Sequence, residues 1–405
     1  MTIEAPEPSP PALTHGALFL RFLRFGLLAF GGPVAQIAMI RRELVDKEAW
    51  ISSARFNRLL AVLQVLPGPE AHELCVHLGV RAKGRLGGLL ASLGFMTPGF
   101  LLMLALAWGY FAIGAHGPAL QAAFLGAQVA VLGLIARAAH RIGEHILIDR
   151  GLWVIALLCG VGSLAGVSFW LLLPAAGLAY ALIKLEHRRL AALAMVVAAA
   201  VAWALVLTAP SATVTAPAPA LATAMPGHAP VWILLITGLK AGLLTFGGAY
   251  TAIPFLRADV VPRGWVADAM FLDGVALAQV IPAPLIIFGT FVGYAAGGFA
   301  GAIVMTAGIF LPAFAFSMIF YDRLEAVVRM TGLHAFLDGI AACVVGLIAA
   351  TALQLGFVTA KTVPSLPIAL TILAAALAGA YLIKHRLAAP AILAVAALAG
   401  VLFFR

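Results

Sequence analysis

The chain has 405 residues, of which 63% are hydrophobic and only 10% are charged, and its formal net charge is +9. A soluble globular domain carries about 25% charged residues, so this composition excludes a water-soluble protein. The apolar runs are long and continuous, which also excludes a β-barrel with its short alternating strands. The sequence therefore predicts an all-α polytopic membrane protein, because helices satisfy their own backbone in hydrocarbon.

The positive charge does not point to nucleic acid. Lys and Arg lie between the apolar segments, as expected for cytoplasmic loops. The three cysteines, Cys75, Cys159 and Cys343, have no C-x-x-C spacing. They predict neither a disulfide framework nor a zinc site, and we expect no cofactor.

Residues 1–16 are rich in proline and lack a basic segment ahead of an apolar run. They predict a short disordered cytosolic tail and not a cleaved signal peptide. The apolar segments then begin, and the first of them directs insertion into the membrane.

Two stretches of the chain repeat each other. "RFGLLAFGG" (24–32) matches "KAGLLTFGG" (240–248), and "QVLPGP" (64–69) matches "QVIPAP" (279–284). Glu43 falls opposite Asp259 and Trp50 opposite Trp265, at an offset of 214 to 216 throughout. A constant offset indicates a duplicated unit. The predicted parts are a tail (1–16), a first repeat (17–185), an extra transmembrane helix (186–207), a Pro/Ala/Thr-rich linker (208–230) and a second repeat (231–405).

The basic residues predict how the repeats face. Residues 81–85 contain three basic residues, whereas their counterpart 295–299 contains none. If the first loop is cytoplasmic, nearly all later Lys and Arg residues also fall inside, and the two repeats have inverted topology. The extra helix 186–207 supplies the change of parity.

The repeated Gly and Pro motifs predict helix breaks. A half-helix that starts inside a membrane protein presents free N–H groups and a positive dipole end, which favour an anion. Residues 17–40 and 56–81 are either single spans or re-entrant helical hairpins, and the five basic residues in 41–58 favour hairpins. The competing interpretation is that "FGG" only allows close helix packing.

Two cations stand at equivalent positions, Arg24 and Lys240, each six residues before the phenylalanine of "FGG". A cation within a span is a functional candidate. We expect both to attract an anion, with snorkelling to the membrane surface as the alternative.

The first repeat follows its "PGP" with Glu70, His72, Glu73 and His77, whereas the second has only apolar residues there. Glu73 and His77 share a helix face. Three interpretations stay open: a proton-coupling pair, a structural buried ion pair, or a metal site. In the other repeat, Asp268 and Asp273 flank Phe271, and we expect them to be solvated near a surface.

At these motifs the sequence resembles the chromate transporter (CHR) family in its long, two-domain form. The resemblance rests on "FGGPVAQIAMIRRELV" and "WISSARFNRLLAVLQVLPGP" in the first half and on "FGGAYTAIPFLRADVV" and "GWVADAMFLDGVALAQVIPAP" in the second. It implies an inner-membrane, multi-pass transporter that exports chromate, with sulfate-like oxyanions as look-alikes. The residues that it implicates in substrate binding are Phe30, Gly31, Gly32, Pro33, Pro67, Gly68, Pro69, Phe246, Gly247, Gly248, Pro282 and Pro284.

Two departures from the family pattern bear on the substrate. Ala283 replaces the glycine of "PGP", and two carboxylates follow the first "PGP" and would repel a dianion unless protonated or paired.

The sequence thus predicts an ion-coupled secondary transporter, and not an enzyme, that binds chromate or a related oxyanion near the midplane of the bilayer. A homodimer is left open, and no nucleic acid partner is expected. The alternatives are a carrier of another anion or of a divalent cation, and a membrane-embedded enzyme. Against the enzyme, the chain has no G-x-S-x-G or H-E-x-x-H motif, and no phosphate-binding loop for ATP.

Overall fold

The computed structural model describes residues 8–63, 68–113, 117–187, 190, 229–245, 248–319 and 331–405. Within these ranges every regular element is a helix, which confirms the predicted all-helical class. The first half contains α1 (His15–Leu27), α2 (Gly32–Arg41), the π-helical η1 (Arg42–Lys47), α3 (Ser53–Leu63), α4 (Glu70–Ile113), α5 (Pro118–Ile146), α6 (Arg150–Leu164) and α7 (Phe169–Lys184). The second half contains α9 (Val231–Leu243), η2 (Ala249–Thr251), α10 (Ala252–Val260), α11 (Asp268–Val280), η3 (Leu285–Ile287), α12 (Phe288–Ile319), α14 (Thr331–Thr362), α15 (Leu366–Leu382) and α16 (Ala388–Phe403).

The helices of the two halves follow in the same order, with breaks at the same motifs. The predicted extra helix 186–207 and the linker 208–230 lie almost entirely outside the described residues. Residue His15 already belongs to α1, whose N-cap Thr14 accepts a hydrogen bond from the Ala17 N–H at 3.2 Å. The cap satisfies one of the free N–H groups at the helix start.

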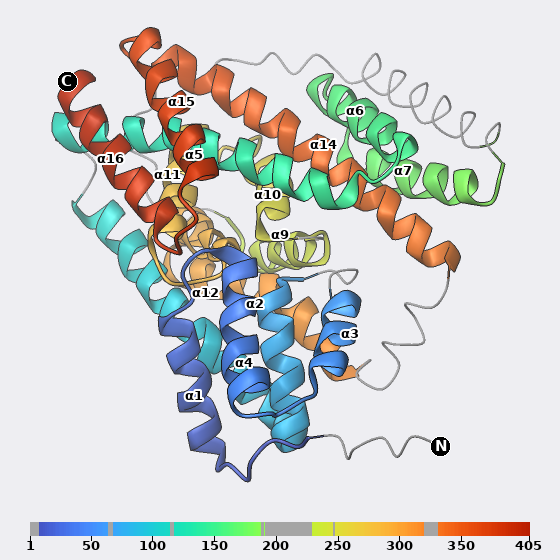
Figure 1. Cartoon of the computed structure of the whole chain (residues 1–405). Coiled ribbons are helices and arrows are strands. Elements are labelled where there is room, and N and C mark those ends of the chain that lie inside the picture. Colours follow the sequence, from blue (N-terminus) through green and yellow to red (C-terminus); the bar gives the residue numbers. More distant parts are fainter. Residues whose placement is uncertain are drawn as a thin grey trace.

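The segment before the first "PGP" folds as a helical hairpin that returns to its starting end. α1 leads to the "FGG" break and α2 leads back (Figure 1). At the open end Arg21 of α1 forms an ion pair with Glu48, which follows η1, and the rings of Phe22 and Trp50 lie 6.3 Å apart. The hairpin alternative, and not the single span, describes this segment.

Helices α4 and α12 are each folded into two arms by the same backbone turn. In α4 the turn has φ/ψ of −146°/30° at Lys83 and 62°/−162° at Gly84. In α12 it has −148°/21° at Gly297 and 61°/−153° at Gly298, 214 residues later. A side chain rarely adopts this second conformation, so glycine is needed at both tips.

The arms of each hairpin pack closely through glycines. A Cβ added to Gly79 would lie 2.5 Å from the carbonyl oxygen of Gly87, and one added to Gly293 would lie 2.5 Å from that of Gly301. Small residues let membrane helices approach in this way. The duplicated sequence therefore gives a duplicated local fold.

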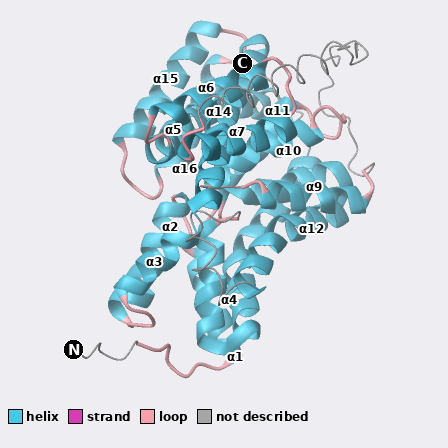
Figure 2. Ribbon diagram, turned by 90° about the vertical axis from the view of Figure 1, so that its right-hand side faces the viewer, coloured by secondary structure: helices cyan, strands magenta, loops and turns pink. Residues whose placement is uncertain are grey.

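The helices gather into two bodies, and each body mixes both halves of the sequence. One body consists of α5, α6, α7, α14, α15 and α16, and the other of α1 to α4 with α9 and α12 (Figures 1 and 2). Within the first body, Gly133 of α5 lies against Ala376 of α15, and Gly346 of α14 lies against Gly160 of α6. Each half thus packs its long helix against the last helices of the other half.

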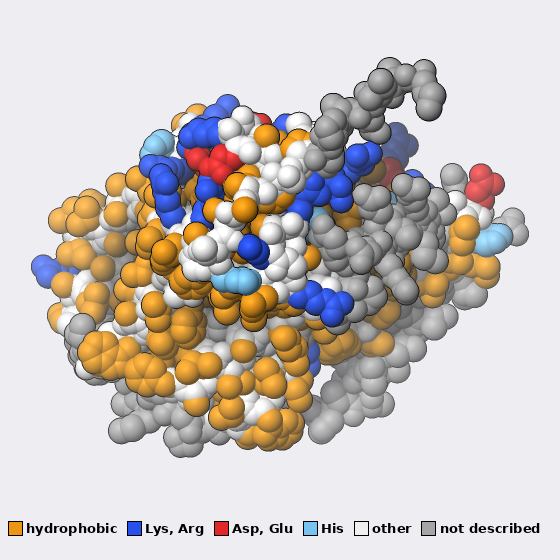
Figure 3. All heavy atoms as spheres, turned by 90° about the horizontal axis from the view of Figure 1, so that it is seen from below, with side chains coloured by type: hydrophobic (Ala, Val, Ile, Leu, Met, Phe, Trp, Pro, Cys, Tyr) orange, Lys and Arg blue, Asp and Glu red, His pale blue; other side chains and the backbone are white. Residues whose placement is uncertain are grey.

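By length and apolar composition, four described helical segments are long enough to cross a membrane: Glu70–Ala112, Pro118–Ile146, Leu285–Met318 and Leu333–Thr362. Hydrophobic side chains cover much of the surface seen from below, while Lys and Arg side chains gather in one part of it (Figure 3). The tip of the α4 hairpin carries exposed Lys83 and Arg85. The chain is therefore a multi-pass membrane protein.

Candidate functional site

The "PGP" break of the first half meets the "FGG" break of the second half inside the protein. The backbone N–H of Gly68 donates a hydrogen bond to the carbonyl of Thr245 at 2.8 Å, and Thr245 directly precedes the second "FGG". Gly68 and Pro69 are buried. Irregular backbone at membrane depth is tolerated only where protein or a cavity surrounds it, and these breaks meet that condition.

Two further contacts join the same region, and they are reciprocal. A Cβ added to Gly68 would lie 3.2 Å from the Cβ of Ala313, and one added to Gly99 would lie 2.4 Å from the Cβ of Ala283. Gly68 and Ala283 are equivalent positions of the repeat, as are Gly99 and Ala313. Such a swap of equivalent positions is what a two-fold relation between two units produces.

The "FGG" of the first half lies apart from these contacts. Gly31 and Gly32 have φ of 92° and 78°, and Pro33 stands in the first turn of α2. A Cβ on Gly31 would lie 3.2 Å from the Cα of Arg386, between α15 and α16. The buried Gln36 closes the break by donating to the carbonyl of Ala29 at 2.9 Å.

The second half closes its "FGG" break with hydroxyl groups. Gly248 has φ of 128°, and the hydroxyl of Thr251 donates to its carbonyl at 2.6 Å. The hydroxyl of Tyr250 donates to Gln279 Oε1 at 3.1 Å, which ties this break to the end of α11, just before buried Pro282 and Pro284.

Some predicted positions cannot be placed in this arrangement. Pro67, Phe246 and Gly247 lie outside the described residues. Phe30 is half-buried next to Gly31. The structure thus brings together the first-half "PGP" and both second-half breaks, and the first-half "FGG" lies apart from them.

The four titratable residues after "PGP" are all buried. Glu73 and His72 are fully buried, and Glu70 and His77 are 8% and 7% exposed. His72 shares a hydrogen bond with Ser92 on the second arm of the hairpin. Its ring also contacts the rings of Phe310 and Phe314 in α12, with centroids 4.8 and 5.0 Å away.

Glu73 lies against the break itself. A Cβ on Gly68 would lie 2.6 Å from Glu73 Oε1. Neither carboxylate oxygen accepts a hydrogen bond from any residue that the structure describes. The interpretations of Glu73 and His77 as a proton-coupling pair or as a structural buried ion pair both stay predictions. An ionised carboxylate without a partner is costly to bury, so a proton or another bound group must offset its charge.

The two symmetric cations lie in different surroundings. Lys240 is 27% exposed at its side chain, and its Nζ lies 3.1 Å from an oxygen of Asp259. Arg24 is exposed and lies near Glu43, the residue equivalent to Asp259. The hydrogen bond from Lys47 lowers the pKa of Glu43, and the charge of Arg24 acts in the same direction. Each cation thus stands near an acid of its own half.

The metal interpretation finds no ligand set in the described part of the chain. No group of three or more His, Cys, Asp or Glu side chains there is placed to hold a metal ion.

The expectation of a solvated position near a surface is wrong for Asp273. Asp273 is only 4% exposed and accepts hydrogen bonds from the Tyr110 hydroxyl and from Gln128 Nε2, both at 2.8 Å. Asp268 pairs with Arg257 at 2.7 Å. The sequence contains a signal for this burial: Asp273 stands in the middle of an apolar helix, and such an acid rarely faces lipid.

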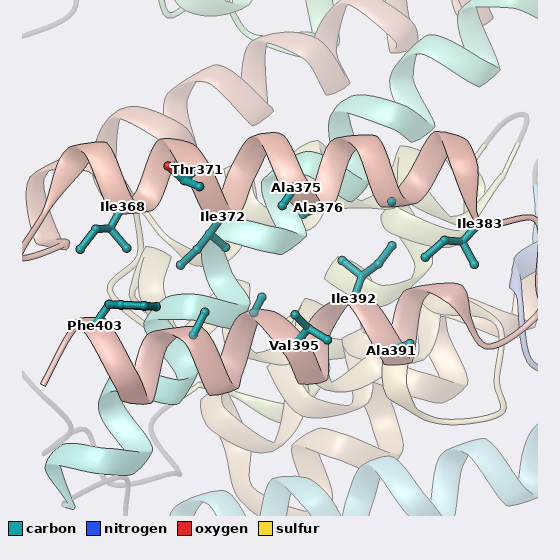
Figure 4. Close-up of a pocket in the computed structure, with 13 residues that line it drawn as sticks. Ile368, Thr371, Ile372, Ala375, Ala376, Ile383, Ala391, Ile392, Val395 and Phe403 are labelled. Carbon is teal, nitrogen blue, oxygen red and sulfur yellow. The ribbon is translucent and has the colours of Figure 1, made fainter.

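A groove lies between α15 and α16, lined by apolar side chains such as Ile372, Ile392 and Phe403 (Figure 4). Thr371 supplies a hydroxyl group, and no lining residue is charged. This chemistry does not suit an oxyanion, which needs N–H donors or positive charge. The helix breaks therefore remain the candidate site.

Comparison with known proteins gives a consistent result over the whole chain. The family described as Chromate transporter matches residues 16–240 and again 232–401. The chain is 62% identical to a chromate transport protein of Pseudomonas aeruginosa, over 98% of this chain and 94% of the other. It is 32% identical to a chromate transport protein of Cupriavidus metallidurans, over 97% of this chain and 94% of the other. A probable chromate transport protein of Synechococcus elongatus is 30% identical over 97% of both chains. No solved structure matches significantly.

Proposed function

The chain belongs to the chromate transporter family, and on that premise we propose that it exports chromate across the inner membrane as a secondary transporter. The observation that carries the proposal is the 62% identity to a chromate transport protein over 98% of the chain. The same match covers 94% of that relative's length.

The oxyanion binds, on this proposal, near the paired breaks. The half-helices that start at Glu70 and Phe288 each begin beside a break, and helix starts offer N–H donors and a positive dipole end to an anion. The contact between Gly68 and Thr245 supports this location, because it holds breaks from both halves at one place.

The two halves are, on the same proposal, inverted repeats that alternate access to this site. The reciprocal contacts of Gly68 with Ala313 and of Gly99 with Ala283 support a two-fold relation. The basic residues at the α4 tip and their absence at the α12 tip support opposite orientations in the membrane.

Transport is coupled to an ion gradient through Glu70, His72, Glu73 and His77. These groups are buried on one arm of one hairpin, beside the break. Glu73 favours a proton as the coupled ion, because a proton neutralises a buried carboxylate that no described residue compensates. With Glu73 protonated, its repulsion of a dianion is removed.

The test is uptake of radiolabelled chromate into inside-out vesicles that contain the protein, with empty vesicles as control. We expect saturable chromate uptake that sulfate or molybdate reduces. Uptake of a divalent metal or of another anion, with no chromate uptake by folded protein, would assign the scaffold to a different substrate.

The predicted role of Lys240, attraction of the anion, is tested with separate variants. Lys240→Ala should abolish uptake, and Lys361→Ala, which removes an exposed lysine at the end of α14, should not. Because Lys240→Ala also frees Asp259, the double variant Lys240→Ala/Asp259→Ala separates two causes. Recovery in the double variant would show that the ion pair is only structural, whereas continued loss would show that transport needs the cation.

A further inference from the structure

Asp273 forms a buried polar junction between the two halves that the proposed coupling group does not use. It lies on α11 of the second half. Its two hydrogen-bond donors come from the first half, Tyr110 on the long arm of α4 and Gln128 on α5, each at 2.8 Å. Both Asp273 and Gln128 are 4% exposed. A single carboxylate thus ties three helices from both halves.

Aromatic rings cover this junction. The ring of Tyr110 contacts Phe124 and Phe291 with centroids 5.4 and 5.1 Å away. Phe111 stacks on Phe291 at 5.8 Å. The surroundings are therefore apolar, and the energetic cost of a bare negative charge is high.

No cation in the described part of the chain forms an ion pair with Asp273. Tyr110 is the titratable group that faces it, and Gln128 is neutral. Helices α12 and α16, which also pack against α11, contain no charged residue. Among the described cations of α5 and α14, Arg137 and His140 pair with Glu144, and His334 pairs with Asp338.

The hydrogen-bond pattern around Asp273 changes with its charge. An ionised carboxylate only accepts, which matches the two donors that it meets. A protonated carboxyl group has lost this charge, so its hydrogen bonds with Tyr110 and Gln128 are no longer charge-assisted, and it can donate to the Tyr110 hydroxyl instead of accepting from it. Protonation therefore weakens the link between α11 and the first-half helices, and loss of the proton restores it.

We propose that Asp273 is a proton-binding residue of the transport cycle, whose protonation releases the α4–α5–α11 junction so that α11 can move relative to α4 and α5. This inference rests on the proposed function, because the proton is taken as the coupled ion. The proton comes from water when the junction opens, and it returns to water on the opposite side when Asp273 again accepts from Tyr110 and Gln128.

The main test compares Asp273→Asn with Asp46→Asn in reconstituted vesicles. Asp46 is an exposed carboxylate on η1, so its variant makes the same chemical change away from the junction. One assay measures chromate accumulation driven by a pH gradient, and the other measures chromate exchange at equal pH on both sides. We expect Asp273→Asn to lose gradient-driven accumulation by at least about tenfold, which corresponds to about 1.4 kcal/mol, and to retain exchange.

Other outcomes of this comparison overturn the inference. Gradient-driven accumulation at the wild-type level in Asp273→Asn would show that the carboxylate does not carry the proton. Loss of both accumulation and exchange by folded Asp273→Asn would show that the residue is only structural.

A second variant keeps the inference testable if Asp273→Asn does not fold. Tyr110→Phe removes one donor to the ionised carboxylate and leaves Asp273 in place. We expect the pH at which transport is half-maximal to rise, because the charged form loses a stabilising hydrogen bond. An unchanged pH profile would contradict the role of the junction.

A third measurement does not depend on chromate. Infrared difference spectra of the reconstituted protein across a pH titration detect the carbonyl band of a protonated carboxyl group. The band should appear in the wild type and in Asp46→Asn and should weaken in Asp273→Asn. Identical spectra of the wild type and Asp273→Asn would overturn the inference, whether or not the wild type transports chromate. A wild type that transports no chromate would, by itself, overturn only the proposed substrate.

Discussion

The hairpins α4 and α12 have the same backbone and different chemistry. Both turn at a residue pair with nearly the same φ/ψ values, and both bring glycines of their two arms into contact. The first arm of α4 buries Glu70, His72, Glu73 and His77, whereas the first arm of α12 buries Phe288, Phe291 and Val292. The duplication has kept the geometry of the hairpin turn and changed the side chains of the first arm.

This difference separates two requirements of a transporter. The repeated geometry supplies a break from each half, which a site that faces both directions needs. A transporter needs one set of titratable groups for each coupled ion, so these groups need not be repeated in both halves. Accordingly, each half buries a carboxylate at a different place. The first half contributes Glu73, and the second contributes Asp273, whose first-half equivalent Arg58 is exposed.

Among the variants that compare the two hairpins, the largest effect should follow from Gly68→Ala, which gives the first-half break the residue that the second half already has in Ala283. At Gly68 φ is 150°, and the new Cβ would lie 2.6 Å from Glu73 Oε1. We expect chromate uptake to fall by at least about tenfold, because the break or the Glu73 side chain must shift.

The control for this variant is Gly109→Ala, on the second arm of α4, where a Cβ meets nothing within 4 Å. Its uptake should equal that of the wild type. Normal uptake by Gly68→Ala would mean that the two breaks tolerate the same residue and that glycine is not required beside Glu73.

An intermediate effect is expected at the hairpin tips. Gly84→Ala and Gly298→Ala place a side chain in a backbone conformation that only glycine adopts readily, with open space around each position. Each should lower the free energy of unfolding by about 1–3 kcal/mol, seen as a lower midpoint of thermal unfolding in detergent. Equal losses would show that the tips are equivalent, whereas a loss at one tip alone would break the comparison.

The helical class, the repeat and the breaks could be predicted because they depend on local signals. A low charged fraction, long apolar runs, and Gly or Pro at a constant offset each act through the backbone or the solvent, whatever the distant contacts are. The hairpin of α1 and α2 could be predicted from the basic residues of 41–58, because basic residues indicate that the chain returns to the cytoplasmic side after α2.

The interleaving of the halves and the surroundings of single side chains could not be predicted in this way. Helix α5 packs against α15, and α14 packs against α6. These helices are apolar around most of their circumference, so the periodicity of the sequence does not indicate which helix each one packs against. The burial of Asp273 could not be predicted, because its donors, Tyr110 and Gln128, are more than 140 residues away in sequence.

The smallest effect should distinguish how the arms of the two hairpins are joined. In α12 the hydroxyls of Thr290 and Thr306 lie 2.7 Å apart, and Thr306 also donates to the carbonyl of Ala302. Thr306→Val should cost about 1 kcal/mol of folding free energy, because the Thr290 hydroxyl is left without that partner. The double variant Thr290→Val/Thr306→Val should recover part of this loss, since no hydroxyl then remains unsatisfied.

In α4 the corresponding contact joins a hydroxyl to an imidazole, so Ser92→Ala leaves His72 buried without its hydrogen bond. We expect a stability loss of about 1–3 kcal/mol together with reduced chromate uptake, whereas the threonine variants of α12 should keep normal uptake. Thermal unfolding and uptake measured on the same preparations decide between the two cases. If Ser92→Ala lost only stability and the threonine variants lost uptake, the arm that supports coupling would be that of α12, and the assignment of the two hairpins would have to be exchanged.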